Sequence, residues 1–107
     1  MPNQPPTFDA TIQRLRREVA LIRSKISSLI NDREELAARK RSILLKQERK
    51  PHPMDWVALE DELDMIKFRL RVVLEEIDKA YIELANKQSV LNVVDAWAGP
   101  PGTTRPV

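Results

Sequence analysis

The sequence predicts an all-α fold, a long antiparallel two-helix coiled-coil hairpin. Two uninterrupted heptad patterns fill most of the 107 residues, and the segment Lys50-Pro51-His52-Pro53 separates them. The charges that flank the two patterns match in sign when the chain folds back on itself. Because a two-helix hairpin buries only one seam, we expect oligomerisation or a partner helix to complete the fold.

The first pattern predicts a helix over about 7–48. Its inward positions alternate in steps of four and three, which keeps one helix face on a 3.5-residue period. Thr7 is the expected N-cap, and Asp9 in the first turn suits the positive end of the helix dipole. The expected inward positions are Phe8, Ile12, Leu15, Val19, Ile22, Ile26, Leu29, Arg33, Leu36, Lys40, Ile43 and Gln47.

The second pattern predicts a turn at about 49–53 and a helix over about 54–98. Pro53 fits the first helical position, although Met54 and Asp55 could instead act as staple and cap, so this boundary is open by about two residues. The expected inward positions are Trp56, Leu59, Leu63, Ile66, Leu70, Val73, Ile77, Ala80, Leu84, Lys87, Leu91 and Val94.

The ends of the chain are expected to lie outside the helices. Gly99 suits the C-terminal cap, and the prolines that follow it stop the second helix. Residues 1–6 and 99–107 are expected to be flexible Pro-rich tails, so that residues 7–98 form one helical hairpin and a single domain.

Charges beside the seam predict the register of the hairpin. Antiparallel folding brings five pairs together, of which four are opposite in sign. A shift of one heptad would instead oppose like charges, so the charges select the register although each exposed pair contributes only about 0–1 kcal/mol. The expected pairs are Lys46 with Asp55, Arg39 with Glu62, Asp32 with Arg69, Lys25 with Glu76, and Glu18 with Glu83.

Composition narrows the classes of function. Residues 8–50 carry twelve basic and six acidic side chains, whereas residues 53–98 carry five and ten, so the two halves largely cancel. The chain has no cysteine, which leaves neither a disulfide framework nor a thiolate metal site. No membrane span or secretory signal is visible, so a cytoplasmic location without membrane binding is expected.

No residue constellation predicts catalysis, a cofactor or a small-molecule substrate. His52 is the only histidine and is expected to be an exposed turn residue, with a metal role as the minor alternative. The acidic run from Glu60 to Asp64 is expected to be a solvated face, because successive helical residues point about 100° apart. Both glycines follow the second helix, which excludes a phosphate-binding glycine loop.

Four polar residues interrupt the seam. Their aliphatic stems can pack there while the polar ends reach water, which we favour over a role in specifying register. They are Arg33, Lys40, Gln47 and Lys87.

The second helix carries apolar side chains on a face away from the seam, where the first helix has only Leu21 at comparable positions. A helix that is apolar on two faces is normally buried on both. This face therefore predicts a protein interface, with a dimer or higher homo-oligomer or a helix of another protein as partner. Its residues are Met65, Phe68, Val72, Ile82, Val90, Val93 and Trp97.

Nucleic acid is the alternative partner. Phosphate contacts need several cations on one face, and Arg14, Arg16 and Arg17 are the candidates. The run Arg39-Lys40-Arg41 spreads around its helix, and no aromatic residue interleaves with it for base stacking. Under this alternative the chain is an assembly factor such as a small phage packaging or scaffolding subunit.

Trp97-Ala98-Gly99 and a hairpin of about 100 residues give an outline that resembles the WXG100 secretion substrates. That family places its tripeptide in the turn between the helices, whereas here the turn is Pro51-His52-Pro53. We therefore do not assign the chain to the family, and a secreted hairpin of this outline stays a third alternative. Prolines at the tip also look like those of type III secretion needle subunits, which are shorter. The first hypothesis is a non-enzymatic assembly module that acts through its second helix.

Overall fold

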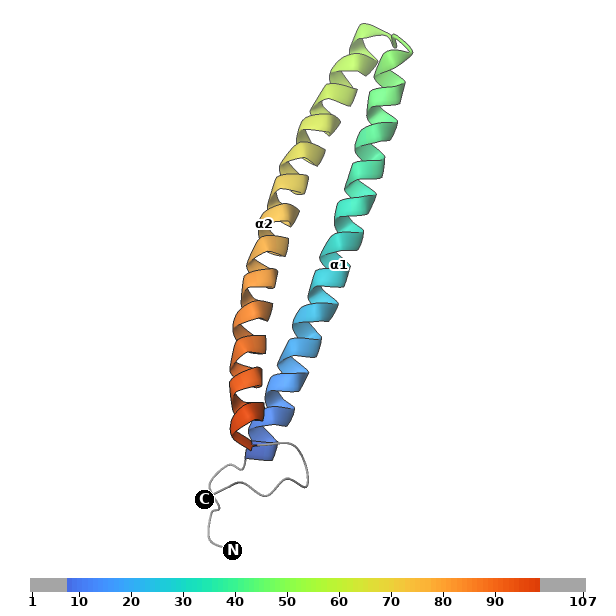
Figure 1. Cartoon of the computed structure of the whole chain (residues 1–107). Helices are drawn as coiled ribbons and strands as arrows, with labels where there is room; N and C mark the ends of the chain where they lie inside the picture. Colours follow the sequence, from blue (N-terminus) through green and yellow to red (C-terminus); the bar gives the residue numbers. More distant parts are fainter. Residues whose placement is uncertain (1–7, 99–107) are drawn as a thin grey trace, which may run out of the picture. The chain divides into compact units, whose positions relative to one another are not determined.

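The chain is an all-α helical hairpin, as the heptad patterns predict. The computed structural model describes residues 8–98, so the expected N-cap Thr7, the C-cap Gly99 and both tails lie outside the described residues. Two helices fill the described range, α1 (Phe8–Glu48) and α2 (Pro53–Ala98) (Figure 1). Within residues 8–98 neither helix has a stretch apolar enough to cross a membrane.

The end of α1 tightens as the chain enters the turn. The Arg49 N–H donates to the Lys46 carbonyl at 3.3 Å, and the Lys50 N–H donates to the Gln47 carbonyl at 3.1 Å. Both bonds span three residues instead of four, and Lys50 has a φ of 52° in the left-handed region. The left-handed residue reverses the chain direction directly after α1, a position that glycine more often fills.

His52 caps the start of α2. Its carbonyl accepts the Trp56 N–H at 2.9 Å, and its ring Nδ1 accepts the Met54 N–H at 3.2 Å. Pro53 is thus the first helical residue, where the missing proline N–H leaves no helical hydrogen bond unmade. Of the two boundaries that the sequence leaves open, the structure has the one with Pro53.

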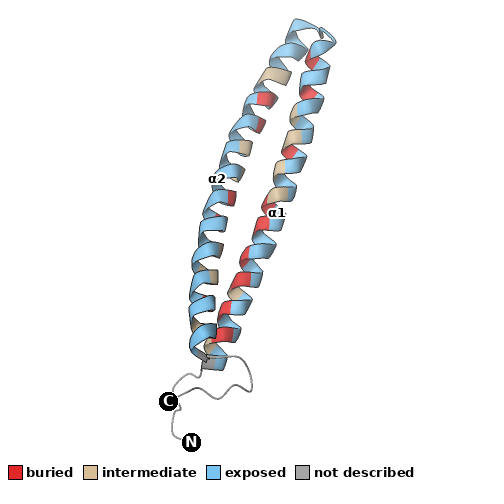
Figure 2. Cartoon of the chain, viewed as in Figure 1, coloured by how far each residue is buried: buried red, intermediate tan, exposed pale blue. Residues whose placement is uncertain are grey.

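The hairpin divides into two compact units, each built from a segment of both helices. Within the described residues, the turn unit comprises Ile26–Lys79, and the terminal unit comprises residues 8–25 and 80–98. In each unit the segment of α1 packs against the segment of α2, and the buried residues lie on the facing sides of the helices (Figure 2).

The buried residues of both units occupy the inward heptad positions. The turn unit contains a core cluster of Leu36, Ile43, Leu63 and Ile66, with Leu59, Leu70 and Val73 partly buried against it. The terminal unit contains a cluster of Ile12, Leu15, Val19 and Leu91, with Leu84 and Val94 partly buried. Trp56 departs from the pattern, because its large indole stays 41% exposed in the first turn of α2.

Candidate protein interface

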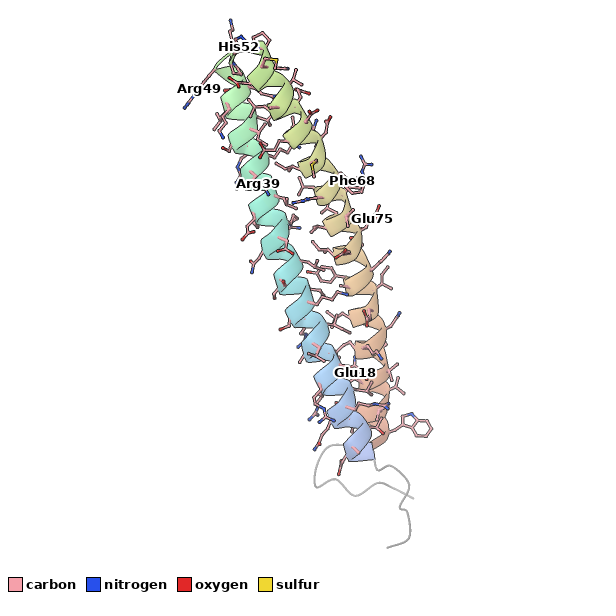
Figure 3. All side chains as sticks on the ribbon, turned by 180° about the vertical axis from the view of Figure 1, so that it is seen from behind. Glu18, Arg39, Arg49, His52, Phe68 and Glu75 are labelled. Atoms are coloured by element: carbon pink, nitrogen blue, oxygen red, sulfur yellow. The ribbon has the colours of Figure 1, made fainter. Side chains whose placement is uncertain are left out.

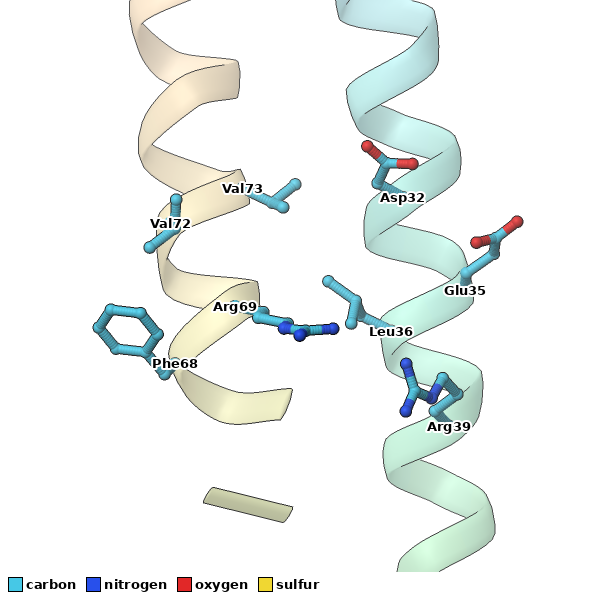
Figure 4. A pocket seen from close by; sticks show the side chains of 8 residues that line it. All are labelled: Asp32, Glu35, Leu36, Arg39, Phe68, Arg69, Val72 and Val73. Carbon is cyan, nitrogen blue, oxygen red and sulfur yellow. The ribbon is translucent and has the colours of Figure 1, made fainter. Parts of the chain in front are cut away.

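An apolar patch covers the outer side of α2 in the turn unit. Met65 is 59%, Phe68 63% and Val72 36% exposed, and we call these three residues the turn-unit cluster. Phe68 projects from α2 away from α1 (Figures 3 and 4). Three large apolar side chains at 3-4 spacing are thus left in water by the hairpin itself.

A hollow of about 400 Å³ lies beside this cluster. Its apolar lining comes from Leu36 and Val73, which belong to the seam, and from Phe68 and Val72 (Figure 4). Charged side chains of both helices complete the lining: Asp32, Glu35, Arg39 and Arg69. The hollow therefore combines an apolar lining with charged neighbours.

A second apolar patch lies on α2 in the terminal unit. Val90 is 49%, Val93 56% and Trp97 64% exposed, and these residues form the terminal-unit cluster. Ile82, in the same unit, is 61% exposed. Every residue that the sequence assigns to the interface is therefore exposed, although its contact with a partner stays a prediction.

α1 exposes two further apolar side chains that the sequence analysis missed. Leu44 and Leu45 of the turn unit are exposed in addition to the expected Leu21 of the terminal unit, and Leu74 of α2 is exposed as well. Leu44 and Leu74 each follow an inward position directly, at Ile43 and Val73. The charge pairs come from the residues that precede inward positions. The residues that follow inward positions would have indicated Leu44 and Leu74 in the same way.

One predicted charge pair of the turn unit is confirmed. Arg39 and Glu62 lie 3.6 Å apart between nitrogen and oxygen. Asp32 and Arg69 line the hollow together but form no ion pair, because Arg69 extends toward Leu36 across the space between the helices (Figure 4).

Two other predicted charge pairs are not confirmed. Lys46 and Asp55 line one surface hollow near the turn without an ion pair between them in the described structure. Lys25 with Glu76 stays a prediction, since these two residues belong to different units.

In the terminal unit Glu18 meets Lys87, a residue that the sequence placed in the seam. Lys87 Nζ lies 3.0 Å from Glu18 Oε2, an oxygen with almost no exposed surface, and Arg14 lies 4.0 Å from the other carboxylate oxygen. The approach of Lys87 is close but poorly directed for a hydrogen bond, so we treat it as an ion pair. The pKa of the Glu18 carboxyl is lowered by contact with the Lys87 ammonium, against the opposing effect of burial, and the charges of Lys87 and Arg14 add to the lowering.

The terminal unit has two further contacts between α1 and α2 that are not among the expected charge pairs. Arg16 lies 3.6 Å from Asp95, and the Arg23 guanidinium donates to Gln88 Oε1 at 3.4 Å. Both join residues that directly follow an inward position. These contacts are exposed, so they specify the pairing of the helices more than they stabilise it.

Gln47 corrects the expectation that polar seam residues extend into water. It is 7% exposed, and its amide donates to Glu60 Oε1 at 2.9 Å. Arg33, Lys40 and Lys87 are half-buried, as expected for stems that pack in the seam. Gln47 is shorter than Lys or Arg and cannot reach water from an inward position, so it finds its partner inside the hairpin.

The nucleic-acid candidates lie on the exposed surface of the terminal unit. Arg14 and Arg16 have side chains that are 65% and 63% exposed, and each contacts a carboxylate, Glu18 and Asp95 respectively. Arg17 lines a shallow hollow together with Arg14. Two of the three cations are thus partly neutralised, which lowers their attraction for phosphate.

No geometry for a metal site is found in residues 8–98, since nowhere in that range do three His, Asp or Glu side chains gather. The His52 ring instead contacts the backbone at the start of α2 through Nδ1. Comparison with family models, with curated proteins and with solved structures finds no match for this chain.

Proposed function

We propose that this chain is a non-enzymatic helical assembly module that binds another helix through the outer face of α2. The partner is a further copy of the chain or a helical segment of another protein. The proposal includes the cytoplasmic location expected from the sequence.

One observation carries the proposal: the unequal exposure of apolar side chains on the two helices. Among the described residues α2 leaves twelve large apolar side chains exposed and α1 leaves three. The seam already buries one side of each helix, so the surplus on α2 is not needed for the hairpin. Removing apolar surface from water contributes about 25 cal/mol per Å², which favours a partner on α2.

The hollow beside the turn-unit cluster supports helix binding in particular. A docked helix presents side chains three and four residues apart, which is also the spacing of Met65, Phe68 and Val72. The charged groups around the hollow, among them Arg39 and Arg69, can pair with polar residues at the edge of such a helix.

The test compares the mass in solution of three chains: the wild type, Phe68→Glu, and the control Leu45→Glu on α1. Phe68 and Leu45 are similarly exposed, at 63% and 58%, so both changes should leave the hairpin fold intact. Phe68→Glu should weaken association sharply, because it would bury an unpaired charge in the interface.

Light scattering and far-UV circular dichroism over one dilution series separate loss of assembly from loss of fold. If the wild type associates and Phe68→Glu keeps the wild-type mass at every concentration, Phe68 is an ordinary surface residue and the assigned face is wrong. If the wild type itself stays monomeric throughout, self-association is wrong, and the partner must be a helix of another protein.

A further inference from the structure

We infer that the partner of α2 is the α2 helix of a second copy, packed antiparallel so that the turn-unit cluster of each copy meets the terminal-unit cluster of the other. This inference rests on the proposed function and specifies its partner, direction and register. It depends on the spacing of the exposed side chains and on the charges between them.

The first and last residues of the two clusters lie symmetrically along the sequence of α2, while the middle residues, Phe68 and Val93, lie 13 and 12 residues from residue 81. Met65 and Trp97 are equally distant from residue 81, and so are Val72 and Val90. An antiparallel pair of α2 helices with its two-fold axis at the level of residue 81 therefore places Met65 opposite Trp97 and Val72 opposite Val90 of the second copy. By helical periodicity alone, at about 100° per residue, the six cluster residues fall within an arc of roughly 80°.

Symmetry makes each of these contacts occur twice. The two-fold axis repeats every contact, so each cluster of one copy is covered by a cluster of the other. Most homodimers bury their interface through this kind of two-fold symmetry. Ile82 is 61% exposed and lies next to the level of the axis, so the two Ile82 side chains meet each other there. The arrangement thus covers all seven residues that the sequence assigns to the interface.

The charges between the clusters select the antiparallel direction. Lys79 and Glu83 are equally distant from residue 81, and both are exposed. Antiparallel packing places Lys79 opposite Glu83 of the second copy, twice. Parallel packing in register would place Lys79 opposite Lys79 and Glu83 opposite Glu83, and like charges in contact disfavour it.

The remaining charge of α2 also fits this register. The acidic excess of the helix comes from residues 53–64, which hold five acidic and no basic side chains: Asp55, Glu60, Asp61, Glu62 and Asp64. Residues 65–97 hold five of each sign. In the proposed register residues 53–63 extend beyond the α2 helix of the second copy, so four of these five acidic side chains lie outside the overlap. The overlapping segments are therefore close to neutral and repel each other little.

Disulfide cross-linking between full-length chains tests the register. The sequence has no cysteine, so every disulfide that forms must involve the introduced cysteines. A mixture of Val72→Cys and Val90→Cys chains should give a covalent dimer with one of each, several-fold more abundant than the dimers formed by either chain alone. Leu45→Cys, on α1, is the exposed control and should cross-link poorly in every mixture.

Charge reversal tests the direction independently. Lys79→Glu and Glu83→Lys should each weaken self-association several-fold, because each places like charges in contact twice. An equimolar mixture of the two variants should restore wild-type association, since every contact between unlike chains is then complementary. Effects within one helix cannot restore it, because they are the same in the mixture as in the separate variants.

Three outcomes would overturn the inference. Efficient cross-linking of Val72→Cys with itself would show parallel packing, and failure of the charge-reversed mixture to recover would show that Lys79 does not face Glu83. In either case a mass loss in Phe68→Glu would still support the proposed function with another register. A monomeric wild type would exclude the second copy, while a foreign helix could still occupy the face.

Discussion

The cost of truncating a seam residue should follow its burial along α2. Ile66 is 1% exposed, the most completely buried large side chain of the described residues, whereas Leu70 at the next inward position is only half-buried. Fully buried aliphatic residues cost about 2–5 kcal/mol on truncation to alanine. We therefore expect Ile66→Ala to cost about 3–4 kcal/mol and Leu70→Ala about 1–2 kcal/mol.

Urea denaturation followed by far-UV circular dichroism measures these costs, with Leu21→Ala as the control. Leu21 is 70% exposed, so its truncation should change the free energy of unfolding by less than about 0.5 kcal/mol. The series is measured at two protein concentrations, because assembly adds to apparent stability.

Two results would refute this reasoning in different ways. An Ile66→Ala cost below about 1 kcal/mol would refute the burial of the seam itself. Equal costs for Ile66→Ala and Leu70→Ala, persisting on dilution, would show that Leu70 is covered within one chain more fully than the structure indicates.

Three further predictions concern polar contacts. Gln47→Ala should lower the free energy of unfolding, measured by urea denaturation, by about 1–3 kcal/mol, because it leaves the half-buried carboxylate of Glu60 without its donor. An unchanged free energy of unfolding would show that Gln47 is solvated after all. His52→Ala should lower the free energy of unfolding by about 0.5–2 kcal/mol through loss of the cap, and His52→Asn should lower it by less. Equal losses for the two variants would mean that the ring does not cap α2. Because the pKa of Glu18 is lowered in the folded chain, its stabilising effect is present above the usual value of 4.5 and is lost as the pH falls through the folded pKa. Carboxyl NMR should find the Glu18 titration below 4.5 in the wild type and raised toward it in Lys87→Met, and an unmoved titration would contradict the pairing.

The heptad pattern was sufficient to predict the seam because inward positions depend only on the helical period. Leu63, Ile66 and Ile77 are buried where the period places them, whereas Trp56, in the first turn of α2, stays 41% exposed. The side-chain partners were harder to predict. Long side chains such as Arg69 and Lys87 can reach several neighbours, and a heptad position does not specify which one they contact.

The candidate surface could be predicted as a set of residues but not as a binding site. Exposure of Phe68 or Trp97 follows from the helical period and from the seam, both of which the sequence contains. The hollow beside Phe68 depends on the packing of Leu36 against Val73, which the period alone does not describe. Exposure alone does not identify the partner, since any apolar helix can cover an apolar face, and the charges of Lys79 and Glu83 are needed to select one.

The short turn between α1 and α2 should determine the order in which the hairpin forms. Gln47 and Glu60 are 13 residues apart in the sequence, whereas Arg23 and Gln88 are 65 apart. Closing the longer loop first would cost about 1.4 kcal/mol more in chain entropy, so the helices should zip from the turn toward the termini. In stopped-flow kinetics, Ile66→Val in the turn unit should slow folding, whereas Val19→Ala in the terminal unit should mainly speed unfolding. If Val19→Ala instead slows folding and Ile66→Val mainly speeds unfolding, the folding nucleus lies near the termini.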